Sequence, residues 1–303
     1  MNFLLSVNTG FAVNRITETE ELMKFASQDL EIQHLQVTSD ILDLYMDKGY
    51  LNKKIKKFNK LRKIYDIKIN STFTGAFSRL HHLGHPDTEV QKFWIKWFKN
   101  FIQFSSNIGA TQCGSHLGIL TYKEDRNKRI RSEKLSRIID NWHKVSIYAN
   151  KAGLTNLVWE PMSISREFGE TIKQCKSIND KLNKNTDIPF KICLDLGHGD
   201  LESKNKDDYN PYKWIKKLSK YSSILHLKQV IKNNFAHLPF TKQNNVKGII
   251  DGAKVIDLLK ENIVGVNSYE LSLELSFKER NPIDYKLKND VKDSVNYWKK
   301  IIK

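Results

Sequence analysis

Short apolar runs alternate with amphipathic segments along the whole chain. The runs predict strands at 2–7, 30–37, 66–73 and 108–113, and four more that end at Glu160, Asp195, His226 and Glu274. Between the runs, apolar residues recur at every third or fourth position, which predicts helices. One such series is Leu51, Ile55, Phe58, Leu61 and Ile64. About eight strand–helix alternations over 303 residues predict an α/β fold, the (β/α)8 or TIM barrel.

Two further features of the pattern bear on the architecture. No linker rich in Pro, Gly or Ser interrupts the alternation, so we predict a single domain of residues 1–303. An open, doubly wound sheet is the alternative, and it would need a glycine-rich phosphate turn after its first strand. The segment at that place, Asn8-Thr-Gly-Phe-Ala12, is not such a turn. The barrel is therefore the favoured architecture.

Side chains that can bind a metal end the last four predicted strands. In a barrel the active site lies at the C-terminal ends of the strands, so Glu160, Asp195, His226 and Glu274 would face one mouth. Three carboxylates there would repel one another unless a cation lay among them. One carboxylate at a strand end is usually a helix cap or an ion-pair partner, but four ligands on successive strands predict a metal site. Three oxygen donors and one imidazole suit Mn²⁺, Co²⁺, Mg²⁺ or Zn²⁺.

Other polar residues near these strand ends are candidates for substrate binding. They are His198, His116, Arg166, Lys228 and Arg280, to which a loop with His81, His82 and His85 can be added. Lys228 lies two residues after His226 and would point the same way. The cations could hold a phosphate by charge-assisted hydrogen bonds, or they could be ordinary surface charges. Each histidine could equally be structural.

The composition limits the possible partners and the localisation of the protein but does not indicate a function by itself. The net charge of +16 could indicate nucleic acid or a phosphorylated substrate, but the excess is mostly lysine scattered over predicted helices. We therefore expect no nucleic-acid partner. No apolar run is long enough to span a bilayer and the N-terminus lacks a signal-peptide pattern, so a cytoplasmic protein is expected. Cys113, Cys175 and Cys193 lie far apart in apolar contexts, which indicates reduced, structural thiols.

The motifs around the predicted ligands resemble the xylose-isomerase-like barrels, a group of sugar-phosphate isomerases and epimerases that includes tagatose/psicose 3-epimerases. The similar segments are Trp159-Glu-Pro-Met-Ser-Ile-Ser-Arg166, Cys193-Leu-Asp-Leu-Gly-His198, Leu225-His-Leu-Lys-Gln229 and Leu273-Glu274. Within the group, the Ser-Arg motif and Asp207-Asp-Tyr-Asn-Pro-Tyr212 are most similar to erythrulose-phosphate (tetrulose-phosphate) epimerases. The resemblance covers nearly the whole chain.

The resemblance implies a mechanism and a substrate class. Glu160 and Glu274 would ligate one divalent metal, such as manganese, and act as the acid–base pair of an enediolate reaction on a small ketose phosphate. A 3-epimerase would return the proton to the opposite face, and an aldose–ketose isomerase would return it to the adjacent carbon. The alternatives are an enzyme of free ketoses, an abasic-site endonuclease and a non-catalytic sugar-binding protein. A homodimer is also expected to be possible.

Overall fold

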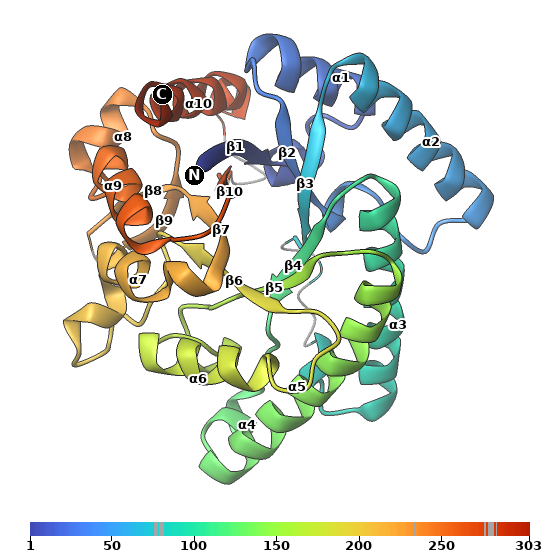
Figure 1. Ribbon diagram of the computed structural model, residues 1–303, viewed down its shortest axis with the longest axis vertical. Coiled ribbons are helices and arrows are strands. Elements are labelled where there is room, and N and C mark those ends of the chain that lie inside the picture. The colour runs from blue at the N-terminus through green and yellow to red at the C-terminus, as the bar shows by residue number, and fades with distance from the viewer. Residues whose placement is uncertain (76–77, 79–81, 233, 276, 278–281, 283) are drawn as a thin grey trace.

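Eight short strands pair in parallel and close into a barrel in the computed structural model of the protein (Figure 1). The structure describes residues 1–75, 78, 82–232, 234–275, 277, 282 and 284–303. Around the barrel the order is β1-β10-β7-β6-β5-β4-β3-β2. These strands are β1 (Asn2–Asn8), β2 (His34–Thr38), β3 (Lys68–Phe73), β4 (Gln112–His116), β5 (Asn156–Glu160), β6 (Phe190–Asp195), β7 (Ser222–Leu227) and β10 (Ser268–Leu273). The predicted (β/α)8 barrel is confirmed.

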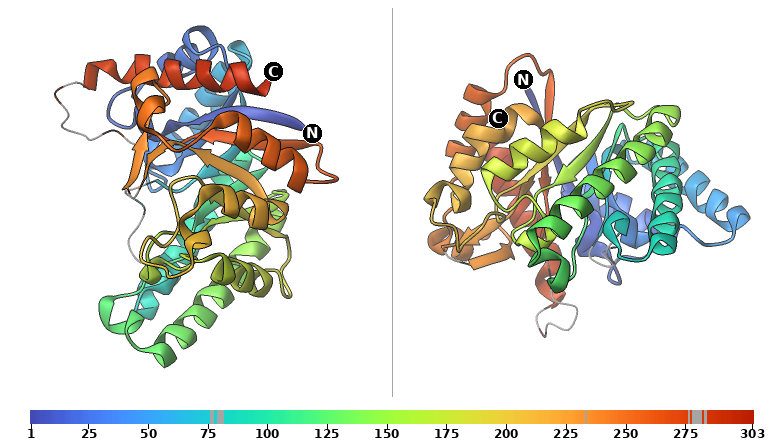
Figure 2. Two further views of the ribbon diagram at one scale, coloured as in Figure 1. Left: turned by 90° about the vertical axis from the view of Figure 1, so that its left-hand side faces the viewer. Right: turned by 90° about the horizontal axis from the view of Figure 1, so that it is seen from below.

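Helices surround the barrel on its outer side (Figures 1 and 2). They are α1 (Thr19–Lys24), α2 (Lys48–Ile64), α3 (Thr88–Asn107), α4 (Tyr122–Asp125), α5 (Lys128–Lys151), α6 (Ile172–Leu182), α7 (Pro211–Leu218), α8 (Lys242–Lys247), α9 (Gly252–Asn262) and α10 (Leu287–Ile302). Their apolar faces and the outward side chains of the strands form one buried cluster, which is the main core. None of the helices in the described ranges is long and apolar enough to cross a membrane.

Strand β10 shows how the sequence divides its side chains between the two sides of the barrel wall. Tyr269, Leu271 and Leu273 belong to the core shared with the helices. Glu270 contacts Gln112 of β4, on the far side of the closed barrel, so its side chain lies in the interior. Because side chains alternate along a strand, Ser272 and the following Glu274 also face inward. This alternation brings Glu274 into the mouth.

The observed strand limits correct three of the predictions. The fourth strand begins at Gln112 rather than at residue 108, because Ile108 caps the end of α3 and Gly109 follows with φ of +92°. The second and third strands begin at His34 and Lys68, later than predicted. Glu31 and Asp66 precede them with φ of +50° and +51°, a left-handed conformation that a strand does not allow.

A small antiparallel hairpin leaves the barrel directly after β7. It consists of β8 (Gln229–Ile231) and β9 (Asn234–Leu238), which form a two-stranded sheet of their own among the described residues. The sequence pattern does not predict this hairpin. Its turn contains no Asn-Gly or Asp-Gly pair, which is the strongest local signal for a hairpin. The hairpin lies at the C-terminal end of β7, where the predicted ligands are found.

The packing of α10 against the barrel can be tested with Trp298, which is fully buried. Its ring contacts those of Phe240 and Tyr297, with centroid separations of 5.3 and 5.7 Å. We expect Trp298→Ala to lower the free energy of unfolding by about 3–5 kcal/mol, because the lost ring leaves a cavity. Urea unfolding would measure this. Asn296→Ala, an exposed position on the same helix, is the control, and equal midpoints for the two variants would contradict the packing.

Candidate metal centre and active site

The barrel brings the four predicted ligands together at one point. Glu160 and Asp195 are the last residues of β5 and β6, His226 lies near the end of β7, and Glu274 directly follows β10. One donor atom from each of the four side chains lies within 4.8 Å of the others. A metal–donor distance of about 2.1 Å puts opposite donors about 4.2 Å apart, so the spacing suits a single divalent ion.

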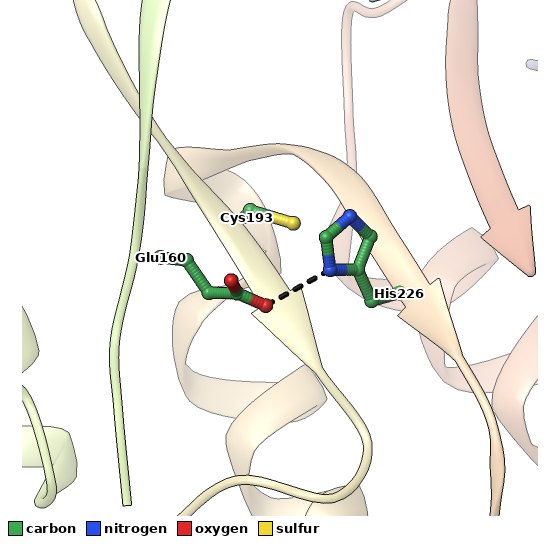
Figure 3. Close-up of side chains that lie close together, drawn as sticks. All are labelled: Glu160, Cys193 and His226. Atoms are coloured by element: carbon green, nitrogen blue, oxygen red, sulfur yellow. Dashed lines mark hydrogen bonds and ion pairs between the residues drawn. The ribbon is translucent and has the colours of Figure 1, made fainter. Parts of the chain in front are cut away.

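His226 has a polar partner on each of its ring nitrogens, and Figure 3 shows the one on the side of Glu160. Nδ1 lies 2.9 Å from Oε1 of Glu160, 3.5 Å from Oε2 of Glu274 and 3.7 Å from Oδ2 of Asp195. On the other side, Nε2 lies 2.9 Å from the side-chain oxygen Oε1 of Gln36, on β2. Nδ1 is therefore the nitrogen that faces the carboxylates and would bind a metal.

Cys193 offers a sulfur atom close to Glu160 and His226 (Figure 3). Its side chain belongs to a small apolar cluster inside the barrel, with Phe73 and two other buried residues. Burial raises the pKa of the Cys193 thiol to about 12. Since the thiolate is the form that binds metals, the neutral thiol favours the set with Asp195 and Glu274 instead. All three cysteines are buried and free, as the sequence predicted.

Lys228 supplies a positive charge among these carboxylates. Its side chain is fully buried, and its ammonium group binds Oδ2 of Asp195 and, at 2.5 Å, Oε2 of Glu274. Burial opposes the charge of Glu274, but Lys228, His226 and His237 together lower the pKa of Glu274 well below its usual value. The pKa of Asp195 is lowered in the same way, with His198 and Lys228 outweighing burial. Both carboxylates are therefore ionised.

His237 joins the site from the β8–β9 hairpin and was not among the predicted site residues. Its Nδ1 lies 3.0 Å from Nζ of Lys228 and 3.6 Å from Oε2 of Glu274. Burial and the neighbouring Lys228 lower the pKa of His237 to about 4, so the ring is neutral near pH 7. Nothing local in the sequence could have found it, because its position depends on the hairpin turning back over the mouth.

The predicted substrate-binding histidines, His198 and His116, lie at different distances from the four ligands. His198 Nδ1 lies 2.8 Å from the carbonyl oxygen of Pro161 and 3.8 Å from Oε1 of Glu160, so it borders the cluster. His116 ends β4, is buried, and lies with its ring centroid 4.0 Å from that of His82.

Arg166, a predicted substrate-binding cation, contacts residues other than the four ligands in the part of the chain that the structure describes. The guanidinium of Arg166 donates to the carbonyl oxygen of Leu120 at 3.0 Å and lies over the ring of Tyr122. Arg166 is in the segment that follows β5, at the same end of the barrel as the ligands. Arg280 and His81 lie outside the residues that the structure describes.

The comparisons with known proteins agree with this geometry. The model of the xylose isomerase-like TIM barrel matches residues 29–301. The chain belongs to the xylose isomerase-like TIM barrel family. It is also 36% identical over 299 residues to the D-erythrulose 1-phosphate 3-epimerase of Brucella abortus, a match that covers 98% of this chain and 96% of that protein. These two findings identify the chain as an enzyme of the sugar epimerase and isomerase class.

Solved structures of the xylose isomerase-like family share the fold. A protein of Rhodospirillum rubrum assigned as a xylose isomerase superposes with a TM-score of 0.88 at 22% identity, and the match covers 99% of both chains. The D-psicose 3-epimerase of Clostridium cellulolyticum H10 superposes with a TM-score of 0.72 at 12% identity, and the match covers 100% of both chains. At these identities the structures show the common barrel rather than a common substrate.

The ion pairs of Lys228 with Asp195 and Glu274 can be tested by removing the ammonium group. Lys228→Met would leave Asp195 and Glu274 beside Glu160 without their cation, so we expect the metal-free protein to lose about 3 kcal/mol of stability. Added Mn²⁺ should restore part of this loss, because a bound cation would replace the missing charge. Thermal unfolding with and without Mn²⁺ measures both effects.

A matched control for this experiment is Lys217→Met. Lys217 forms an ion pair of 3.1 Å with Asp207, in which both side chains are partly exposed. Breaking such a pair costs about 1 kcal/mol or less, and Mn²⁺ should not change the result. A Lys228→Met protein as stable as this control would show that the ammonium group does not balance the carboxylates.

Proposed function

We propose that the protein is a divalent-metal-dependent 3-epimerase of a small ketose phosphate, of the erythrulose phosphate type. The observation that carries the proposal is the position of Glu160 and Glu274. They come from β5 and β10, two strands separated by β6 and β7, and both carboxylates approach Nδ1 of His226. The relative from Brucella abortus, a D-erythrulose 1-phosphate 3-epimerase, supports the choice of substrate class. We also propose that residues 1–303 act as one domain.

In this proposal the two glutamates move the proton, and the other ligands hold the cation. Glu160, Asp195, His226 and Glu274 would bind the metal, which when bound supplies Lewis-acid stabilisation of the substrate's oxygens. One glutamate, in its ionised form, removes the proton alpha to the carbonyl and becomes protonated, which leaves a planar enediolate. The second glutamate, which carries a proton at that stage, gives it to the opposite face and so inverts the carbon and becomes ionised in turn. Two carboxylates on different sides of the mouth are what inversion requires.

The neighbouring residues support this chemistry by charge and position. Lys228 keeps Asp195 and Glu274 ionised in a buried site, and an ionised glutamate is the form that can accept a proton. His198, beside Glu160, is placed to bind a substrate hydroxyl. His116, Arg166, Lys228 and Arg280 remain proposed substrate-binding residues. A free ketose is the second candidate substrate, since psicose and tagatose 3-epimerase structures share the fold.

Proton NMR of erythrulose 1-phosphate with the protein in D2O is the direct test of the reaction. We expect the signal of the proton alpha to the carbonyl to disappear with Mn²⁺ and to persist with EDTA. The product spectrum separates an epimer from an aldose. The same measurement with free erythrulose and psicose tests the second candidate. An unchanged spectrum for all three sugars with metal bound would contradict the proposal.

The two-glutamate mechanism predicts a severe loss in either single variant. Glu160→Gln and Glu274→Gln each remove a group that transfers a proton, so kcat should fall by about 10²–10⁴-fold or more. The circular dichroism spectrum should stay unchanged, since each substitution keeps the side-chain volume. Glu261→Gln, at an exposed position on α9, is the control and should keep full activity. Near-normal turnover in either site variant would rule out the pair.

Arg166 tests whether the substrate carries a phosphate. If Arg166 binds the phosphate by charge-assisted hydrogen bonds, Arg166→Ala should raise the KM for erythrulose 1-phosphate by about 10-fold or more. The KM for free erythrulose should change little, which separates phosphate binding from a general effect on the loop at Leu120. Arg137→Ala, an exposed position on α5, is the control. Equal effects on both sugars would remove Arg166 from the phosphate site.

A further inference from the structure

A row of buried polar side chains continues from His226 into the barrel interior, below the carboxylates. Gln36, on β2, is fully buried, and its Oε1 accepts hydrogen bonds from Nε2 of His226 at 2.9 Å and from Nδ2 of Asn8 at 2.6 Å. Its Nε2 donates to Oγ of Ser71 on β3, at 3.0 Å. The epimerase mechanism proposed above uses none of the residues beyond His226.

A buried carboxylate lies inside the barrel beside this row and is held by other residues. Glu270 accepts hydrogen bonds from Oγ of Ser6 at 2.7 Å and from Nε2 of Gln112 at 3.4 Å. It is 2% exposed, and burial raises its pKa to about 7. The row that starts at His226 therefore ends at Ser71.

The hydrogen bonds of this row run in one direction. The amide of Asn8 is oriented by Gly10, whose N–H donates to its Oδ1 at 2.8 Å, so its Nδ2 donates to Oε1 of Gln36. The amide of Gln36 cannot turn over without placing its NH2 group against that of Asn8. Its oxygen therefore faces Nε2 of His226 as an acceptor, and its own NH2 group donates to Ser71. Hydrogen bonds that run in one direction polarise and strengthen one another.

We propose that Gln36, held by Ser71, is a positioning residue that keeps the N–H of His226 on Nε2 and leaves the Nδ1 lone pair to the metal. Metal-binding histidines usually donate their second N–H to a carboxylate or carbonyl oxygen, which fixes the ring and makes the ligand more basic. Here the acceptor is the side-chain carbonyl oxygen of Gln36. The inference rests on the metal site of the proposed function.

The affinity for Mn²⁺, measured by calorimetry at pH 8, tests the row without relying on turnover. Gln36→Leu removes the acceptor for His226, so the dissociation constant should rise by about 10–100-fold. Ser71→Ala should cause a smaller loss in the same direction, because Gln36 keeps its bond to His226 but loses the one to Ser71. Combining Ser71→Ala with Gln36→Leu should add little to the loss in Gln36→Leu, because the row is already broken.

Thr72→Val is the matched control. Thr72 is as buried as Ser71 and lies next to it on β3, but its hydroxyl contacts Ser105 of α3, outside the barrel wall. Its loss should leave the affinity for Mn²⁺ unchanged. Equal affinities in wild type, Gln36→Leu and Ser71→Ala would contradict the positioning role of Gln36 while leaving the proposed function intact. A wild-type protein that binds no divalent ion would overturn both.

A second measurement covers the case in which a buried variant does not fold. In ¹⁵N-labelled wild type, the Nε2–H proton of His226 should exchange slowly with water, because it is buried and hydrogen-bonded to Gln36. Its signal is assigned by its loss in His226→Asn. Absence of such a slowly exchanging imidazole proton from the wild-type spectrum would overturn the proposal.

Discussion

Repulsion among three carboxylates at the barrel mouth is the constraint on which the site depends. Glu160, Asp195 and Glu274 approach the same nitrogen of His226, and Lys228 offsets part of their charge. One lysine leaves an excess of negative charge, which a divalent cation would balance. Strong hydrogen bonding alone does not make such a cluster stable, because the desolvation of buried charges is costly. The same excess that makes the metal-free site costly is what would attract the proposed metal.

The barrel itself turns this local chemistry into a site. Closed parallel strands deliver their last residues to one rim, so ligands that are up to 114 positions apart along the chain become neighbours. The interior below the rim is polar in part, with Gln36 bound to Ser71 and Glu270 bound to Ser6. It also holds the small apolar cluster that contains Phe73 and Cys193. The apolar layer between strands and helices encloses this interior, and the four candidate ligands lie at its upper end.

The sequence predicted what depends on local pattern and missed what depends on contact across the fold. The barrel and the convergence of Glu160, Asp195, His226 and Glu274 followed from strand periodicity and from strand ends. His237 was missed because its place is set by the turn of a hairpin. Gln36 and Glu270 did carry a signal, since each is a polar residue between two large apolar neighbours in its strand. The signal could not say which partners they would meet, because register between distant strands is a property of the closed barrel.

The pairing of β1 with β10 also has a consequence for how the chain folds. Asn2 lies opposite Ser268, so the first strand has no neighbour on one side until almost the entire chain has been synthesised. Contacts between residues so far apart in sequence form slowly, and an unpaired strand edge can bind other chains in the meantime. During translation, the edge of β1 that pairs with β10 therefore stays free until β10 has been made. The barrel closes late, and Glu160 at the end of β5 meets Glu274 after β10 only then.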